Sequence, residues 1–196
     1  TFSVSDGEYT ATADVSVTVA AVNDAPVLAT VADVSFDEDG SGNTSLSAAD
    51  VDGDDLTYNI TGGTDISASL SGSDISFSAP ANYNGSESFT VSVTDGEYTD
   101  SQSITVTVNA VNDAPTANAA SGATDEDQSV VITLSGDDID GDNLTFSLSS
   151  NATNGSVSLD GSLATYTPNE NYFGDDSFTF SVSDGEYTAT ADVSVT

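Results

Sequence analysis

The sequence repeats with a period of 89 residues, and this repeat limits the possible folds more than any other feature. The tripeptide Asp-Gly-Glu begins at Asp6, Asp95 and Asp184, and 95 − 6 and 184 − 95 both equal 89. The pentapeptide Val-Asn-Asp-Ala-Pro occurs twice at the same spacing. A long fixed period is the signature of an array of similar domains. The chain of 196 residues therefore divides into one partial copy and two full copies of a unit, at 1–21, 22–110 and 111–196.

The first and last 18 residues of the chain have the same sequence. Thr1–Thr18 is identical to Thr179–Thr196, whereas the middle copy at Thr90–Thr107 differs at eight of these 18 positions. This pattern indicates a higher-order period of two units, 2 × 89 = 178 residues, and predicts a window cut from a longer array. On that interpretation residues 1–21 hold the last two strands of a preceding repeat, and an isolated hairpin is only marginally stable.

Apolar and hydroxylated residues alternate along each unit. Phe89–Thr94 reads Phe-Thr-Val-Ser-Val-Thr, and Ile104–Val108 and Leu56–Ile60 follow the same period of two. This alternation buries one row of side chains and exposes the other, as in the strands of a sandwich. We find no segment with helical periodicity. We therefore expect an all-β chain of tandem seven-stranded immunoglobulin-like β-sandwiches in a linear array.

Turn signals between the alternating runs place seven strands in each unit. In the first unit the strands are predicted near 27–36, 44–48, 56–61, 66–70, 75–79, 88–94 and 101–109. In the second unit they are predicted near 116–124, 129–134, 144–149, 155–158, 163–167, 177–183 and 188–195. Seven short strands within 89 residues are typical of an immunoglobulin-like domain.

The charge composition excludes several classes of function. The chain has 33 Asp and Glu but no Lys, Arg or His, so its net charge is −33 at pH 7. Binding of nucleic acid or of an anionic membrane surface needs cationic side chains, and there are none. Without Cys and His, the usual zinc, haem and iron–sulfur ligands are missing, as are the partners that activate a nucleophile. We expect no enzyme activity, and the sequence indicates no small-molecule substrate.

The acidic residues indicate a folded protein that needs a cation. Strong acidity is also found in disordered chains, but here hydrophobic residues make up 37% and follow the strand pattern. The acids lie in short clusters at fixed positions of the repeat. Carboxylates with no basic neighbour repel one another, so a counterion is needed. Calcium accepts about 6–8 oxygen ligands in flexible geometry and fits such clusters better than magnesium, which demands a strict octahedron.

Strand direction predicts where the acidic loops meet. If the strands run alternately up and down, connections 1–2 and 5–6 and the linker lie at one end of a unit. Connections 2–3 and 6–7 then lie at the other end, so the acids of consecutive units would converge on the junction between them. The predicted metal ligands are, in chain order, Asn23, Asp24, Glu38, Asp50, Asp52, Asp54, Glu87, Asp95, Asn112, Asp113, Glu126, Asp138, Asp140, Asp142, Asn143 and Asp184.

Several of these motifs resemble those of cadherins. Val111–Pro115 resembles the linker between cadherin repeats, and Asp138-x-Asp140 followed by Leu-Thr-Phe resembles their paired-Asp motif and third strand. Glu38 and Asp184 stand where the family has its first-strand Glu and its late Asp. The resemblance covers essentially the whole chain and is closest to the cadherin-like tandem repeats of large bacterial secreted calcium-binding adhesins. It implies an immunoglobulin/cadherin-like sandwich with several calcium ions at each junction, which they stiffen.

The sequence departs from the cadherin pattern at one place and leaves some alternatives open. Cadherins usually offer Asp-x-Glu between strands five and six, where only Glu87 and Asp176 match here. The clusters are also compatible with solvated acidic turns, and Asp-Gly-Glu with an ordinary hairpin turn. A carbohydrate-binding module of a secreted polysaccharide-degrading protein is the alternative function, although Trp is absent. A glycosidase with two carboxylates is a third, but duplicated loops do not make a cleft.

The function that we expect is a calcium-rigidified spacer or adhesion segment of a bacterial surface or matrix adhesin or filament. Such a segment would be secreted and would act outside the cell. Its expected partners are the neighbouring repeats of the same chain, together with homophilic or lateral filament contacts.

Overall fold

The computed structural model describes residues 1–196 and confirms the all-β expectation, with 20 strands and no helix. The chain folds into two compact units, each of which is described by itself. Unit 1 comprises Thr1–Pro80 and Gly85–Val108, and unit 2 comprises Ala81–Asn84 and Asn109–Thr196. No helix is present that could cross a membrane.

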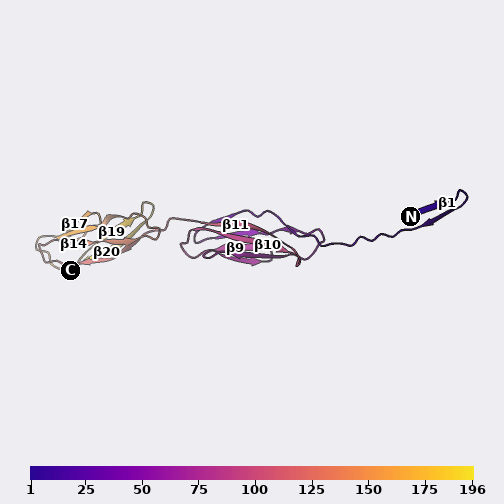
Figure 1. Cartoon of the computed structure of the whole chain (residues 1–196). Helices are drawn as coiled ribbons and strands as arrows, with labels where there is room; N and C mark the ends of the chain where they lie inside the picture. The colour runs from indigo at the N-terminus through magenta and orange to yellow at the C-terminus, as the bar shows by residue number, and fades with distance from the viewer. The chain divides into compact units, whose positions relative to one another are not determined.

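Unit 1 is a sandwich of a four-stranded and a three-stranded sheet, with one further strand pair. The four-stranded sheet has the order β4 (Val34–Asp37), β11 (Thr99–Asn109), β10 (Gly85–Thr94), β7 (Thr57–Gly62). The three-stranded sheet has the order β5 (Ser41–Ser45), β9 (Asp74–Ser78), β8 (Ser67–Ser71), and the further pair is β3 (Val27–Leu28) with β6 (Ala48–Ala49). Strands β9, β10 and β11 are labelled in Figure 1. Phe77 of β9 and Phe89 of β10 meet edge to face with ring centroids 5.3 Å apart, so the two sheets share one core.

Unit 2 repeats this architecture. Its four-stranded sheet has the order β13 (Ala120–Gly122), β20 (Thr188–Val195), β19 (Asp176–Ser183), β16 (Thr145–Ser150). Its three-stranded sheet has the order β14 (Val130–Thr133), β18 (Leu163–Pro168), β17 (Gly155–Asp160), and the further pair is β12 (Thr116–Asn118) with β15 (Ser135–Asp137). Figure 1 labels β14, β17, β19 and β20 of this unit.

The alternating residues form the cores, as predicted. Val91 and Val93 of unit 1 and Phe180 and Val182 of unit 2 are all 0% exposed. The residues between them in the strands point outward and are partly or fully exposed. Burial of these side chains is the main favourable contribution to folding of each unit.

The first strand of each unit differs from the prediction, while the other six begin and end within three residues of it. The predicted strand 27–36 is split into β3 and β4, and the predicted strand 116–124 is split into β12 and β13. In unit 2, β12 pairs with β15, whereas β13 runs parallel to β20. The chain therefore leaves one sheet and joins the other halfway along this segment, which side-chain periodicity does not reveal.

Side chains of β11 hold the first-strand segment of unit 1. The Leu28 N–H donates to Asp100 Oδ2 at 2.8 Å, and the Val31 N–H donates to Gln102 Oε1 at 3.1 Å. The Gln102 amide nitrogen in turn donates to the Val31 carbonyl at 2.6 Å. Alanines 189 and 191 stand 89 residues later in unit 2, so these clamps belong to unit 1 alone.

The hairpin of β1 (Phe2–Ser5) and β2 (Thr10–Ala13) shows that identical sequence does not mean identical burial. Phe2 and Val4 are 58% and 65% exposed, whereas their identical counterparts Phe180 and Val182 are 0% exposed. β2 covers four residues, whereas its counterpart β20 covers eight and has neighbours on both sides. The turn thus forms from local sequence, while the long strands need the rest of the sandwich.

Asp176 is a buried acid of unit 2 that backbone amides stabilise. It is 9% exposed, and its Oδ1 accepts from the N–H groups of Thr153 at 3.1 Å and Ser177 at 2.9 Å. Its Oδ2 accepts from the Asn154 N–H at 2.8 Å and the Tyr166 hydroxyl at 3.0 Å. Burial by itself raises the pKa of Asp176, but these hydrogen bonds outweigh it and hold the pKa below its usual value.

Unit 1 solves the same problem with a different pair of residues. Glu87 and Phe77 stand 89 residues before Asp176 and Tyr166. The longer Glu87 side chain reaches loop amides, and the Phe77 ring has no hydroxyl to donate. In unit 2 burial, together with the hydrogen bond to Asp176, raises the pKa of Tyr166 to about 12. The Tyr166 hydroxyl therefore stays protonated and donates at any physiological pH.

The first prediction concerns Asp176. Because its pKa is lowered by folding, its contribution to stability is complete above the pKa of the unfolded chain and is lost as pH falls through the folded pKa. Asp176→Asn should therefore lower the free energy of unfolding of unit 2 by about 1–3 kcal/mol at pH 7, and by less near pH 3. Hydrogen exchange followed by mass spectrometry localises the loss to unit 2. Asp160→Asn, an exposed acid of the same unit, is the control, and equal effects of the two substitutions would contradict the assignment.

The second prediction compares two glycines of unit 1 that both have positive φ. Gly63 (φ +78) has no room for a Cβ, which would lie 2.3 Å from the Ile66 carbonyl oxygen and 2.6 Å from Phe89 Cζ. Gly72 (φ +65) has nothing within 4 Å of that position. Gly72→Ala should cost about 1 kcal/mol of backbone strain, and Gly63→Ala roughly 1–3 kcal/mol more because of the clash. Urea denaturation followed by circular dichroism measures both, and matching costs would show that Gly63 is not tightly packed.

Candidate metal centres

Three carboxylates of unit 1 lie together in the loop that follows β6. The side chains of Asp50, Asp52 and Asp54 each offer one oxygen, and these oxygens lie within 4.8 Å of one another. Gly53 has a φ of +81°, which lets the chain reverse tightly between the second and third acid. Asp50 Oδ1 accepts from the N–H groups of Asp52 at 2.9 Å and Gly53 at 3.0 Å, which closes the loop around the first acid.

Unit 2 has the same arrangement in the loop that follows β15. The side-chain oxygens of Asp138, Asp140 and Asp142 lie within 4.8 Å of one another, and Gly141 has a φ of +78°. Asp138 Oδ1 accepts from the N–H groups of Asp140 at 3.0 Å and Asp142 at 3.2 Å. The Asp-x-Asp-Gly-Asp spacing thus produces the same three-carboxylate group twice.

One oxygen in each group is buried without a hydrogen-bond partner. These atoms are Oδ2 of Asp50 and Oδ2 of Asp138. A buried acceptor left unpaired costs free energy, and the cost is larger for a charged group. Native proteins leave few such atoms unexplained, and an ion that the atom binds is one of the accepted explanations. A hard cation bound at this oxygen would satisfy it.

The linker residues before each unit are fastened to these loops. In unit 1 the Asp24 N–H donates to Asp52 Oδ2 at 2.7 Å. In unit 2 the Asp113 N–H donates to Asp140 Oδ2, also at 2.7 Å. The second acid of each loop therefore holds the backbone of the Asn-Asp dipeptide that the sequence analysis assigned to the metal site.

The late Asp of each unit joins the same assembly through the linker Asn. The Asn23 side-chain amide donates to Asp95 Oδ2 at 3.0 Å, and the Asn112 amide donates to Asp184 Oδ2 at 3.0 Å. Asp95 Oδ1 also accepts from the Glu97 and Tyr98 N–H groups, both at 2.7 Å. The Asp-Gly-Glu motif is therefore a hairpin turn whose Asp also holds the linker.

Hydrogen bonds keep these late acids ionised. The Tyr98 N–H is the largest cause that lowers the pKa of Asp95, against burial, with help from the Glu97 N–H and the Asn23 amide. For Asp184, burial raises the pKa, but the Asn112 amide and the hairpin N–H groups outweigh it and lower the pKa overall. Both side chains are thus available as anionic oxygen ligands at neutral pH.

Asp54 shows how strongly the acids of unit 1 repel one another. Burial is the largest cause that raises its pKa, and the negative charges of neighbouring acids raise it further. These neighbours are Asp50, Asp52, Asp95 and Asp55. No Lys, Arg or His exists anywhere in the chain to offset this charge. An exogenous cation is the available source of compensation.

Three predicted ligands lie outside the three-carboxylate groups. Glu38 is buried, with 6% of its surface exposed, directly after β4. Both oxygens of Glu87 accept loop N–H groups, from Asp65 at 3.0 Å, and from Thr64 at 2.8 Å and Ile66 at 3.2 Å. The N–H groups of Asp65 and Thr64 are the largest causes that lower the pKa of Glu87. A ligand role for these residues stays a prediction.

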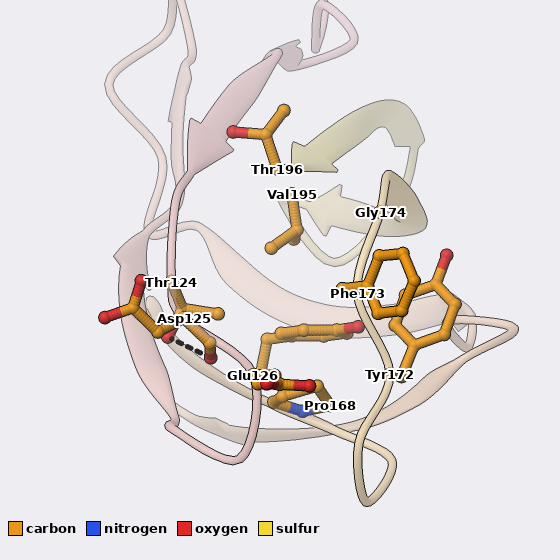
Figure 2. A pocket seen from close by; sticks show the side chains of 10 residues that line it. Thr124, Asp125, Glu126, Pro168, Tyr172, Phe173, Gly174, Val195 and Thr196 are labelled. Carbon is orange, nitrogen blue, oxygen red and sulfur yellow. Dashed lines mark hydrogen bonds between the residues drawn. The ribbon is translucent and has the colours of Figure 1, made fainter.

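Glu126, the third of these residues, lines a pocket in unit 2. The pocket has a volume of about 400 Å³, and Figure 2 shows Glu126 beside Asp125 and Pro168, with the rings of Tyr172 and Phe173 on the facing wall. Phe173 is 84% exposed, so the expectation that aromatic residues form the core does not hold for this ring. Its sequence position in an Asn-Tyr-Phe-Gly turn, outside any alternating run, is the signal that distinguishes it.

Asp55 is the residue that the predicted ligand set omits. The set contains Asn143 but not Asp55, which stands at the same position of the loop in unit 1. Asp55 adds to the negative charge that acts on Asp54. Comparison of the two loops residue by residue was the signal that could have found it.

The donor atoms of the two loops define what they can bind. Carboxylate, carboxamide and backbone oxygens are hard ligands, which calcium prefers and soft transition metals do not. Three clustered carboxylates with a buried unpaired oxygen fit a divalent cation of this kind. The residues that would hold it are Asp50, Asp52 and Asp54 in unit 1 and Asp138, Asp140 and Asp142 in unit 2.

Solved structures share the fold of the chain. Human protocadherin-24 EC1-2 Form II is similar with a TM-score of 0.59 and 16% identity, over 89% of this chain and 100% of that one. A second structure of human protocadherin-24 EC1-2 gives a TM-score of 0.52 and 16% identity, over 89% and 99% of the two chains. These likenesses confirm the predicted immunoglobulin/cadherin-like fold.

Other comparisons cover less or find nothing. The endo-fucoidan hydrolase MfFcnA4 of glycoside hydrolase family 107 is 22% identical with a TM-score of 0.37, over 87% of this chain. The chain spans only 28% of the length of that hydrolase, and the low score carries no argument. No curated protein sequence matches the chain.

The family of the chain is decided by its sequence. The family described as Bacterial Ig domain matches residues 23–107 and again residues 112–196, which together make up most of the 196 residues. The two matches fall on the two repeats, and each repeat folds as an immunoglobulin-like sandwich. The chain is a tandem pair of domains that belongs to the bacterial Ig domain family.

Proposed function

We propose that the chain is a calcium-stiffened structural and adhesion module that acts outside the cell as a spacer segment of a bacterial surface or matrix adhesin or filament. The observation that carries this proposal is the buried, unpaired Oδ2 atom of Asp138, matched by that of Asp50, inside a group of three carboxylates. A divalent cation would remove the cost of that atom and the repulsion around it. Membership of the bacterial Ig domain family supports a structural role.

The contacts of the linker support a stiffening effect. Asp113 follows Asn109, the last residue of β11, by four residues, and its N–H is held by Asp140 Oδ2. A cation at the three carboxylates of unit 2 would fix Asp140 and, through it, this part of the linker. Fewer backbone conformations would then be open to the residues between β11 and β12. The same reasoning applies to Asp24 and Asp52 in unit 1.

The net charge supports a second effect of the cation, on contacts between molecules. At −33 and without any basic side chain, copies of the chain repel one another in the absence of divalent cations. Bound calcium would reduce this repulsion. We infer that the partners are neighbouring repeats of the same chain and, when arrays meet, further copies that pack homophilically or laterally.

The third prediction tests cation binding in the complete chain. Isothermal titration with calcium should show binding, and saturation at roughly 100 times the dissociation constant should add about 2.7 kcal/mol of stability. Asp138→Asn should abolish or strongly weaken the site of unit 2 and leave the site of unit 1 intact. Asp160→Asn removes the same charge at an exposed position outside both loops and should change neither site.

Small-angle X-ray scattering tests the stiffening itself. The chain with millimolar calcium should give an extended and uniform profile, and the chain with chelator a more compact or heterogeneous one. Asp138→Asn in calcium should behave like the chelated chain. Identical profiles with and without calcium would refute the spacer mechanism. The absence of any calorimetric signal would refute calcium binding as well.

A further inference from the structure

The two acidic loops match closely but differ in charge at one position. Asp50–Asp55 reads Asp-Val-Asp-Gly-Asp-Asp, and Asp138–Asn143 reads Asp-Ile-Asp-Gly-Asp-Asn. The apolar residues at the second position, Val51 and Ile139, are 85% and 63% exposed and bring no charge. The sixth position is Asp55 in unit 1 and Asn143 in unit 2.

The backbone of the two loops is the same around this difference. The glycines have φ angles of +81° and +78°, and the linker N–H that each loop binds lies 2.7 Å from its acceptor in both units. The linker Asn amide binds the late Asp at 3.0 Å in both units. The first acid has its Oδ2 buried and unpaired in both. The side chain at position 55 or 143 is therefore the main chemical difference between two otherwise equivalent sites.

Asp55 acts on the site through its charge. It is one of the acids whose negative charge raises the pKa of Asp54, together with Asp50, Asp52 and Asp95. A charge that a neighbouring carboxylate feels is also felt by a cation bound to that carboxylate, with the opposite sign. Asn143 offers a carboxamide oxygen at the same place but no charge.

We propose that this single position sets the cation affinity of each loop, Asp55 strengthening the site of unit 1 and Asn143 keeping the site of unit 2 weaker than the same loop with Asp. The inference rests on the proposed function, in which both loops bind calcium. One extra unit charge within roughly 7 Å of a divalent cation, at a water-like dielectric, corresponds to about a tenfold change in affinity. A tandem array could thus carry sites of graded affinity on one backbone.

The experiment that tests the fourth prediction exchanges the two residues in the complete chain. Calcium titration is followed by nuclear magnetic resonance through the amide signals of Gly53 and Gly141, one in each loop. Asp55→Asn should weaken the site reported by Gly53 about tenfold and leave the site reported by Gly141 unchanged. Asn143→Asp should strengthen the site reported by Gly141 by a similar factor. Asp160→Asn, in the turn between β17 and β18, controls for the change in net charge and should move neither curve.

Salt and the parent chain separate the possible outcomes. Because exposed charges are screened, the effect of each exchange should shrink markedly between about 0.02 and 0.5 M monovalent salt. Exchanges that alter affinity less than twofold, or by a factor that salt does not change, would overturn the inference while leaving calcium binding intact. If neither glycine signal of the parent chain responds to calcium, the proposed function itself fails. Dispersed spectra without calcium show that each variant is folded.

Discussion

The constraint on which the structure depends is the repulsion among carboxylates in a chain that has no basic residue. Salt bridges between side chains are impossible here, so every acid must be solvated, hydrogen-bonded to neutral donors or bound to a cation. The first choice suits exposed positions, where water screens charge. Buried acids need the second or the third, and the structure uses backbone N–H groups wherever the chain can supply them.

Backbone N–H groups take the place of Lys and Arg throughout both units. Asp176 accepts from three of them, Glu87 accepts from three, and Asp95 accepts from two. These bonds order the loops on which the acids lie, because each acid fixes several residues of backbone at once. The carboxylate clusters of the two loops are the exception, since Oδ2 of Asp50 and Asp138 has no such donor. This difference separates the structural acids from the candidate ligands.

Much of the fold was predictable because period-two alternation reports burial directly. Strands such as β10 and β19 lie in the middle of their sheets, and their alternating residues leave no ambiguity. The first strand was less predictable because it changes sheets, and the partner of a strand is a tertiary property. The exposed hairpin at residues 1–13 makes the same point, since its sequence equals that of buried strands in unit 2.

The loop acids of the candidate site were predictable from spacing alone, because Asp-x-Asp-Gly-Asp determines a local turn. The use of Glu87 on backbone N–H groups was not, because the loop that supplies them lies more than 20 residues earlier in sequence, at Thr64–Ile66. Asp55 was also missed, because its effect is electrostatic and needs no contact. Local sequence therefore gives the first-order site, and the tertiary structure decides which acids it excludes.

The exchange of Phe77 and Glu87 in unit 1 for Tyr166 and Asp176 in unit 2 has a genetic consequence. The Tyr166 hydroxyl reaches the carboxylate of the shorter Asp176 side chain at 3.0 Å, whereas unit 1 has a longer acid and no hydroxyl. Tandem repeats of similar sequence recombine, and a crossover between these two positions would join the tyrosine to the glutamate or the phenylalanine to the aspartate. Either hybrid unit would inherit a mismatched pair. The two residues are therefore expected to be inherited as a block, which limits where such an array can gain or lose repeats.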